Sequence, residues 1–180
     1  MKLYAASSSK VEVNGETIYS VIDGMGAFES TAKKILADNG ITEVHAGKWY
    51  NQQAWLNAFK TIAEKVGNMT LFNIGMKIPE NAKFPPEVND THKALASIDI
   101  AYHMNHRGGE IGHYQYVRIG DCEAQIVCTN PYPDDFDKGI ITAMCRKFVM
   151  KIMSVKVVVD ETKPDRTHGG DSTTLLVTWK

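Results

Sequence analysis

Cysteine is scarce in this sequence of 180 residues, and the few cysteines present follow no known pattern. Cys122, Cys128 and Cys145 form no CxxC pair and have neither disulfide nor zinc-ribbon spacing. An odd number of thiols without such spacing favours a reducing compartment, so we expect a cytoplasmic protein. Because their neighbours are apolar, Cys128 and Cys145 are expected to be buried and unreactive.

Excess charge and long apolar runs are also missing. The formal net charge is −1, so no basic surplus indicates a nucleic-acid partner. No stretch approaches the roughly 18–20 apolar residues that a membrane span needs. With 43% hydrophobic and 23% charged residues, the chain can bury a core of its own.

The common catalytic motifs are absent as well. The sequence contains no phosphate-binding glycine loop, no G-x-S-x-G elbow and no H-E-x-x-H. Without a catalytic constellation, a role other than catalysis is favoured, and an enzyme stays the alternative.

The pattern of apolar residues predicts a mixed α and β protein. The sequence VEVNGETIYSVI alternates around Asn14-Gly15 and predicts a β-hairpin over 10–22. A helical region is expected over 24–106, because apolar residues recur there at helical spacing. Its members are expected at 26–38, 50–67, 69–78 and 91–106, the last capped by Asp90.

After Gly108-Gly109 the apolar period changes to two, which indicates a strand–helix–hairpin region over 112–179. Because strands and helices do not alternate regularly, the order favours an α+β fold whose antiparallel sheet carries helices on one face. Strands are expected at 113–119, 123–129, 154–160 and 172–179, and a helix from Asp134 onward.

Three of the six histidines fall within HMNHRGGEIGHY, residues 103–114. His103 and His106 are three residues apart on an expected helix end, and His113 can fold back toward them. Three imidazoles would suit zinc or iron with one coordination position open. The alternative is that the histidines bond free carbonyls at a helix C-terminus.

Acidic and basic residues elsewhere have ordinary structural explanations. Asp134, Asp135 and Asp137 open a helix, whose positive end favours acids. Arg166, His168 and Asp171 belong to a polar loop between two strands. We expect a solvated turn there, and contact with an anionic ligand is the alternative.

Aromatic residues and methionines gather in the middle of the chain. If the helices hold a cavity, these side chains are candidates for its walls, although core packing is the alternative. The candidates are Trp55, Phe59, Phe72, Met76, Tyr102, Met104, Tyr114 and Tyr116.

Five stretches of the chain together form one overall pattern, namely GKWYNQQAWLNAFKTIAEKVG, LFNIGMKIPENA, GHYQYVRIGDCEAQIVCTNPYP, DDFDKGIITAMCRKF and GGDSTTLLVTW. In this pattern the chain resembles the 4-vinyl reductase domain family. Wider relatives of that family are the haem–nitric oxide-binding (H-NOX) domains and the TRAPP trafficking-complex subunits. The resemblance implies an α+β fold of the H-NOX/TRAPP kind, with a ligand cavity between its layers and a homodimer.

Cofactor motifs of those relatives are only partly represented. The haem ligand of H-NOX domains is a histidine on a helix, which His103 or His106 could match. The tyrosine-x-serine-x-arginine signature for the haem propionates is absent. Some 4-vinyl reductase-like members carry cysteines after NPYP and in the last hairpin, but Asp134 follows Pro133 here and the last hairpin has no cysteine.

Three hypotheses follow for residues 1–180, which we expect to form a single ligand-binding domain. The first is a ligand-binding or sensory domain for a small, hydrophobic molecule, with neither a nucleic-acid partner nor a membrane span. The second is a protein that holds zinc, iron or haem on His103, His106 and His113, as a gas sensor or a metalloenzyme. The third is a dimeric scaffold.

Overall fold

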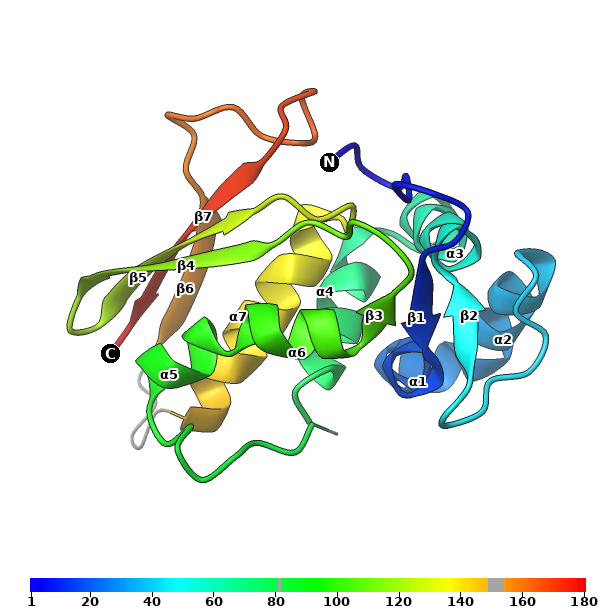
Figure 1. Cartoon of the computed structure of the whole chain (residues 1–180), viewed down its shortest axis with the longest axis horizontal. Helices are drawn as coiled ribbons and strands as arrows, with labels where there is room; N and C mark the ends of the chain where they lie inside the picture. The colour runs from blue at the N-terminus through cyan, green and yellow to red at the C-terminus, as the bar shows by residue number, and fades with distance from the viewer. Residues whose placement is uncertain (81, 149–153) are drawn as a thin grey trace.

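The structure, a computed structural model, describes residues 1–80, 82–148 and 154–180. A small sheet and three helices lie beside a larger sheet and its helices (Figure 1). Most of this smaller part comes from the first third of the chain, and the third strand of its sheet comes from residues 106–107. The strands are β1 (Glu12–Asn14), β2 (Trp49–Asn51), β3 (His106–Arg107), β4 (Tyr114–Gly120), β5 (Glu123–Cys128), β6 (Val155–Val159) and β7 (Thr173–Trp179). The helices are α1 (Gly15–Met25), the 3-10 turn η1 (Gly26–Phe28), α2 (Glu29–Asp38), α3 (Gln52–Lys65), α4 (Asn68–Lys77), α5 (Thr91–Ala96), α6 (Ile98–Met104) and α7 (Asp134–Phe148).

The larger sheet confirms the α+β prediction. Its order is β4-β5-β7-β6, and each neighbouring pair is antiparallel. Alternate residues of β5, such as Ala124 and Ile126, are buried, while Val117 on β4 and Val158 on β6 are exposed on the opposite face, as the strand register places them. Figure 1 shows the helices on one side of this sheet. Helices therefore cover one face of this sheet, as the period of two predicts.

Helix α7 packs closely against α4 through two glycines. A Cβ on Gly75 would lie 2.2 Å from the carbonyl oxygen of Phe136, and a Cβ on Gly139 would lie 2.2 Å from that of Phe72. The backbones of α4 and α7 can approach each other this closely only because neither glycine has a side chain. Both glycines therefore set the position of α7 beneath the sheet.

The predicted hairpin over 10–22 is wrong. Only Glu12–Asn14 is a strand, and helix α1 begins at Gly15. Asn14 caps that helix, since its side-chain oxygen accepts a hydrogen bond from the Thr17 N–H at 2.9 Å. Asn-Gly suits a helix start as well as a tight turn, and burial of Ile18 and Val21 favours the helix here.

The helix expected over 91–106 is two helices. Asp90 caps the first as predicted, accepting from the Lys93 N–H at 2.8 Å. The break falls at Ser97, whose hydroxyl donates to the Ala94 carbonyl at 2.8 Å and so competes with continued helix hydrogen bonding. His106 then enters strand β3, which pairs with β1. The three-stranded sheet β2-β1-β3 was not predicted, because strands of two or three residues show no alternation.

Helices α2, α3, α4 and α7 confirm the remaining helix predictions. The last of them, predicted from Asp134 onward, is described as far as Phe148, and residues 149–153 lie outside the described part of the chain. Among the described helices, none is both long enough and apolar enough to cross a membrane.

Substitution of Gly139 by Ala should lower the free energy of unfolding by about 1–3 kcal/mol, since the new methyl group meets backbone that cannot move away. Denaturant titration measures the effect. Gly120→Ala is the control, because its Cβ would meet only the Glu123 side chain at an ordinary 3.6 Å. Equal stability of Gly139→Ala and the parent protein would contradict the close approach of α4 and α7.

Candidate ligand-binding site

A cavity of about 80 Å³ lies where α6, α7 and β4 meet the segment that follows α4. Its walls are almost entirely apolar. Thr17 of α1 and His106 of β3 are the lining residues that come from the part of the molecule with the smaller sheet. The lining residues are Thr17, Ile78, Pro79, Ala82, Phe84, Ile98, Ala101, Tyr102, Asn105, His106, Tyr114, Tyr132, Phe136, Ile140 and Met144.

His106 supplies the imidazole of this cavity. Its Nδ1 lies 2.8 Å from the carbonyl oxygen of Tyr102. A carbonyl can only accept, so Nδ1 carries the proton and Nε2 keeps its lone pair. The Tyr132 hydroxyl then donates to Nε2 at 2.7 Å. The pair of His106 and Tyr132 is a neutral, hydrogen-bonded group in an otherwise apolar wall.

Burial determines the protonation states of the histidine and the tyrosines in the cavity wall. Burial lowers the pKa of His106 to about 4, although the hydrogen bond to the Tyr102 carbonyl opposes the shift. Burial likewise raises the pKa values of Tyr102, Tyr114 and Tyr132. At neutral pH these lining residues are therefore uncharged.

Two of the eight predicted cavity residues line this cavity, namely Tyr102 and Tyr114. Trp55 and Phe59 are fully buried elsewhere in the core, where their rings pack edge to face. Met104 is 73% exposed on the surface. Tyr116 instead bonds His92, and Phe72 and Met76 lie on α4 outside the lining.

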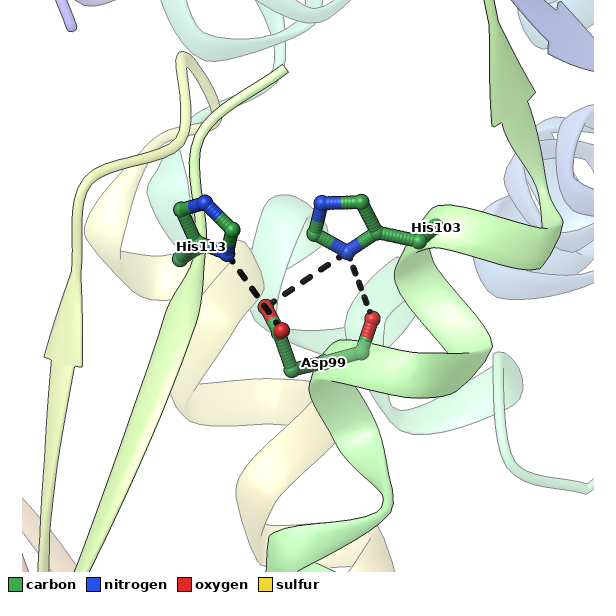
Figure 2. Close-up of side chains that lie close together, drawn as sticks. All are labelled: Asp99, His103 and His113. Carbon is green, nitrogen blue, oxygen red and sulfur yellow. Dashed lines mark hydrogen bonds and ion pairs between the residues drawn. The ribbon is translucent and has the colours of Figure 1, made fainter. Parts of the chain in front are cut away.

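The three predicted histidines divide between two places. His103 and His113 lie on the surface with their rings 4.9 Å apart, and both face the carboxylate of Asp99 (Figure 2). The Nδ1 atoms of His103 and His113 lie 3.6 Å and 3.3 Å from its oxygens. His106 points inward to the cavity, because the chain leaves α6 after Met104 and turns into β3. Asp99, which the sequence pattern did not identify, is instead the third member of the group with His103 and His113.

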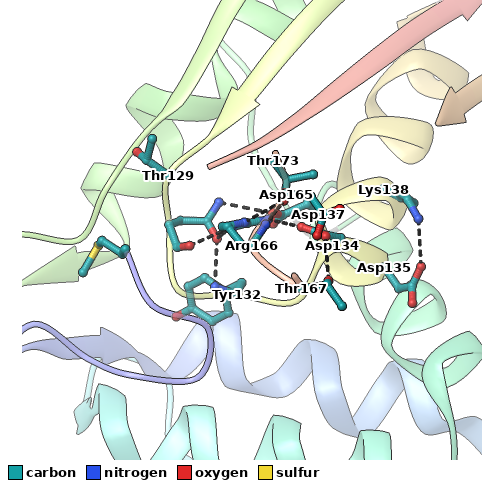
Figure 3. A network of polar contacts seen from close by, with 12 residues as sticks. Thr129, Tyr132, Asp134, Asp135, Asp137, Lys138, Asp165, Arg166, Thr167 and Thr173 are labelled. Carbon is teal, nitrogen blue, oxygen red and sulfur yellow. Dashed lines mark hydrogen bonds and ion pairs between the residues drawn. The ribbon is translucent and has the colours of Figure 1, made fainter. Parts of the chain in front are cut away.

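Arg166 was expected in a solvated turn, and that prediction is wrong. Its side chain is fully buried, and Nη2 donates to Asp134 and, at 2.7 Å, to Asp137 (Figure 3). Nη1 donates to the backbone oxygen of Asn130 at 2.6 Å and to its side-chain oxygen at 2.8 Å. Tyr114 donates its hydroxyl to the same Asp137. These contacts join the β6–β7 loop to α7 and to strand β4.

Asp134 and Asp137 therefore do more than complement the helix dipole, which is how the sequence alone explained them. Burial raises the pKa of Asp137, and the neighbouring Arg166 is the main influence that opposes this rise. The guanidinium is held by these groups, so it offers no charge to a ligand. A single arginine in a long polar loop gives no sequence signal of such a pairing.

The two buried cysteines are poor candidates for a nucleophile. Cys128 and Cys145 are buried as predicted, and burial raises the pKa of both thiols, that of Cys145 to about 12. Cys122 is exposed. A thiol that stays protonated is a poor nucleophile and a poor metal ligand.

Solved structures share this architecture, although the sequence by itself matches no protein-family profile and no curated protein. An H-NOX protein from S. oneidensis superposes with a TM-score of 0.70 at 11% identity, over 93% of this chain and 99% of that one. The chain has the H-NOX fold. An H-NOX protein from K. algicida gives a TM-score of 0.67 at 12% identity, covering 93% and 96% of the two chains. A mutant H-NOX protein from T. tengcongensis gives 0.67 at 14%, covering 93% and 97%.

Arg166→Met should cost about 3–5 kcal/mol of unfolding free energy at pH 8, because it leaves two carboxylates buried without their cation. The loss should shrink toward pH 5. Removing the arginine raises the pKa of Asp137 further, and a protonated carboxyl tolerates burial better than a charged one. Denaturant titrations at the two pH values measure both effects.

Arg118→Met is the matched control, since the Arg118 pair with Asp121 is exposed and should contribute less than about 1 kcal/mol. A loss for Arg166→Met that is small, or that does not change with pH, would contradict the buried ion pair.

The free energy of unfolding should fall as the pH is lowered from about 6.5 to about 4, by up to about 3 kcal/mol from His106 alone. The unfolded chain takes up this proton near pH 6.5, whereas the folded protein resists it until about pH 4. His106→Gln keeps a polar side chain that does not titrate, so it should flatten this part of the curve. Identical pH dependence in the two proteins would refute a buried, neutral His106.

Proposed function

We propose that this chain is a binding domain for a small apolar molecule, held in the cavity between α6, α7 and β4. The observation that carries the proposal is the wall itself, which is apolar apart from the neutral pair of His106 and Tyr132 and a few further polar atoms. A ligand cavity of a protein has this composition, in which a few placed polar groups interrupt an apolar surface.

The volume limits the ligand to few atoms. An engineered cavity of roughly 150 Å³ admits benzene, and the cavity here has about 80 Å³. A gas molecule or a short hydrocarbon fits that space without any rearrangement. A charged ligand is disfavoured, because the residues described in the lining include no lysine or arginine to compensate a buried anion.

The position of the cavity supports a sensory role. Thr17 of α1 and His106 of β3 line it together with Ile140 and Met144 of α7. A bound molecule would therefore contact both the small-sheet part and the large-sheet part of the fold. Occupancy that favours one relative position of these parts would give a sensor its output.

Haem is the second candidate, because H-NOX proteins of the same fold have been solved in Fe(II) and Fe(II)NO states. One observation favours it, namely an imidazole in the cavity wall. Three oppose it: Tyr132 already occupies Nε2, the volume is far too small for a porphyrin, and the described lining has no cation for the propionates. The residues present do not fit haem, so we propose a ligand without it.

The cytoplasmic location, the homodimer and the likeness to 4-vinyl reductase domains remain predictions from the sequence. A dimeric scaffold would not need the cavity. An experiment that fills the cavity therefore distinguishes the scaffold hypothesis from the binding-domain hypothesis.

Xenon is a suitable probe, since it binds apolar cavities without needing a hydrogen bond. Under xenon pressure, methyl resonances of Ile98, Ile140 and Met144 should shift with saturation at one site. Ala101→Phe places a ring in the cavity and should abolish the shifts. Ala37→Phe, on the exposed face of α2, should leave them unchanged. Unchanged shifts in Ala101→Phe, or none in the parent protein, would overturn the proposal.

Addition of haemin to the same preparations distinguishes the second candidate. We expect no stoichiometric Soret band in the parent protein. A Soret band at one equivalent that is lost in His106→Ala would show that the cavity opens for haem, and it would replace our proposal.

A further inference from the structure

Asp99, His103 and His113 form a surface cluster that is separate from the cavity. Asp99 and His103 lie one turn apart on α6, and His113 directly precedes β4 (Figure 2). One ligand atom from each lies within 4.8 Å of the other two. We propose that these three residues bind a divalent transition-metal ion, for which Zn²⁺ is the representative.

The donor set is chemically suited to such an ion. Two imidazole nitrogens and one carboxylate oxygen are typical ligands of zinc and of other first-row divalent metals. Calcium and magnesium are disfavoured, because they take oxygen ligands almost exclusively. A site of this composition therefore selects for a transition metal.

The spacing requires only a small closure. Metal–ligand bonds of about 2.0–2.2 Å in a tetrahedron place the ligand atoms about 3.3 Å apart. Asp99 Oδ2 and His113 Nδ1 already have this separation, at 3.3 Å, and Asp99 Oδ1 and His103 Nδ1 are close to it at 3.6 Å. Nδ1 of His103 also lies 2.8 Å from the backbone carbonyl oxygen of Asp99, so this ring must turn away from the carbonyl before Nδ1 can bind a metal. No pair must contract by more than about 1.5 Å, which rotation of two half-exposed imidazoles can supply.

The backbone and the carboxylate are already held in place. Asp99 Oδ1 accepts the Tyr114 N–H at 2.8 Å, which ties α6 to the start of β4. The His113 N–H donates to the Thr129 hydroxyl at 2.9 Å, which ties the same segment to the end of β5. Hydrogen bonds that orient a ligand in this way reduce the entropy that metal binding must overcome.

Three protein ligands leave at least one coordination position open. Ile100 and Met104 flank the cluster and are 66% and 73% exposed, so this position faces solvent. A water molecule or a donor atom of another molecule would complete the coordination. His106 takes no part, so metal binding and cavity binding can be tested independently.

Isothermal titration with Zn²⁺ tests the proposal, in a Cys122→Ser background because an exposed thiol can bind zinc itself. We expect one equivalent to bind, and His103→Gln or His113→Gln to weaken binding at least tenfold. His168→Gln is the matched control. It removes an exposed histidine that pairs with Asp165 at 2.8 Å, away from the proposed site, and should leave zinc affinity unchanged.

Co²⁺ supplies a second readout, because its visible absorption reports ligation by nitrogen and oxygen at low coordination number. The Co²⁺ bands should vanish in the His103→Gln/His113→Gln double variant while its circular dichroism spectrum stays that of the parent. Zinc binding that survives in this double variant, or no binding at one equivalent in the parent, would overturn the proposal.

Discussion

The buried guanidinium of Arg166 organises the part of the molecule that surrounds the cavity. It lies among the carboxylates of Asp134 and Asp137 and the backbone of Asn130, so one side chain connects the β6–β7 loop, the start of α7 and the loop before it. Tyr114 donates to the same Asp137 while its ring lines the cavity. The cavity wall thus depends on an ion pair whose own residues do not line the cavity, and loss of the cation would leave two buried charges without compensation.

Helix α6 lies between the surface cluster of Asp99, His103 and His113 and the cavity. Its exposed side carries Asp99 and His103 next to His113, where water keeps the groups available to a metal ion. The chain then turns into β3 and places His106 in the interior, where burial keeps its imidazole neutral. One short histidine-rich sequence therefore supplies both a surface cluster and a cavity wall. The H-NOX fold accommodates this arrangement with a cavity too small for a porphyrin.

Long periodic segments were predictable, and short ones were not. Helices α3, α4 and α7 and strands β4 to β7 follow from repeated apolar residues. The hairpin predicted around Asn14-Gly15 was wrong because tight turns and helix caps favour the same residues. Of the cavity, Tyr102 and Tyr114 were predicted, whereas Ile140 and Met144 were not. A helix shows in its sequence which face is apolar, but not which part of that face borders a cavity.

The sequence alone determined the α+β class, the order of most elements and the burial of Cys128 and Cys145, because local apolar periodicity and turn residues control these features. Only the tertiary structure decided that Arg166 is buried, that Asp99 joins His103 and His113, and that His106 stands apart from them. The physical reason is distance along the chain. Arg166 meets Asp137 across 29 residues, and His106 meets Tyr132 across 26. Contacts of this kind are fixed by how helices and strands pack, and no local pattern encodes them.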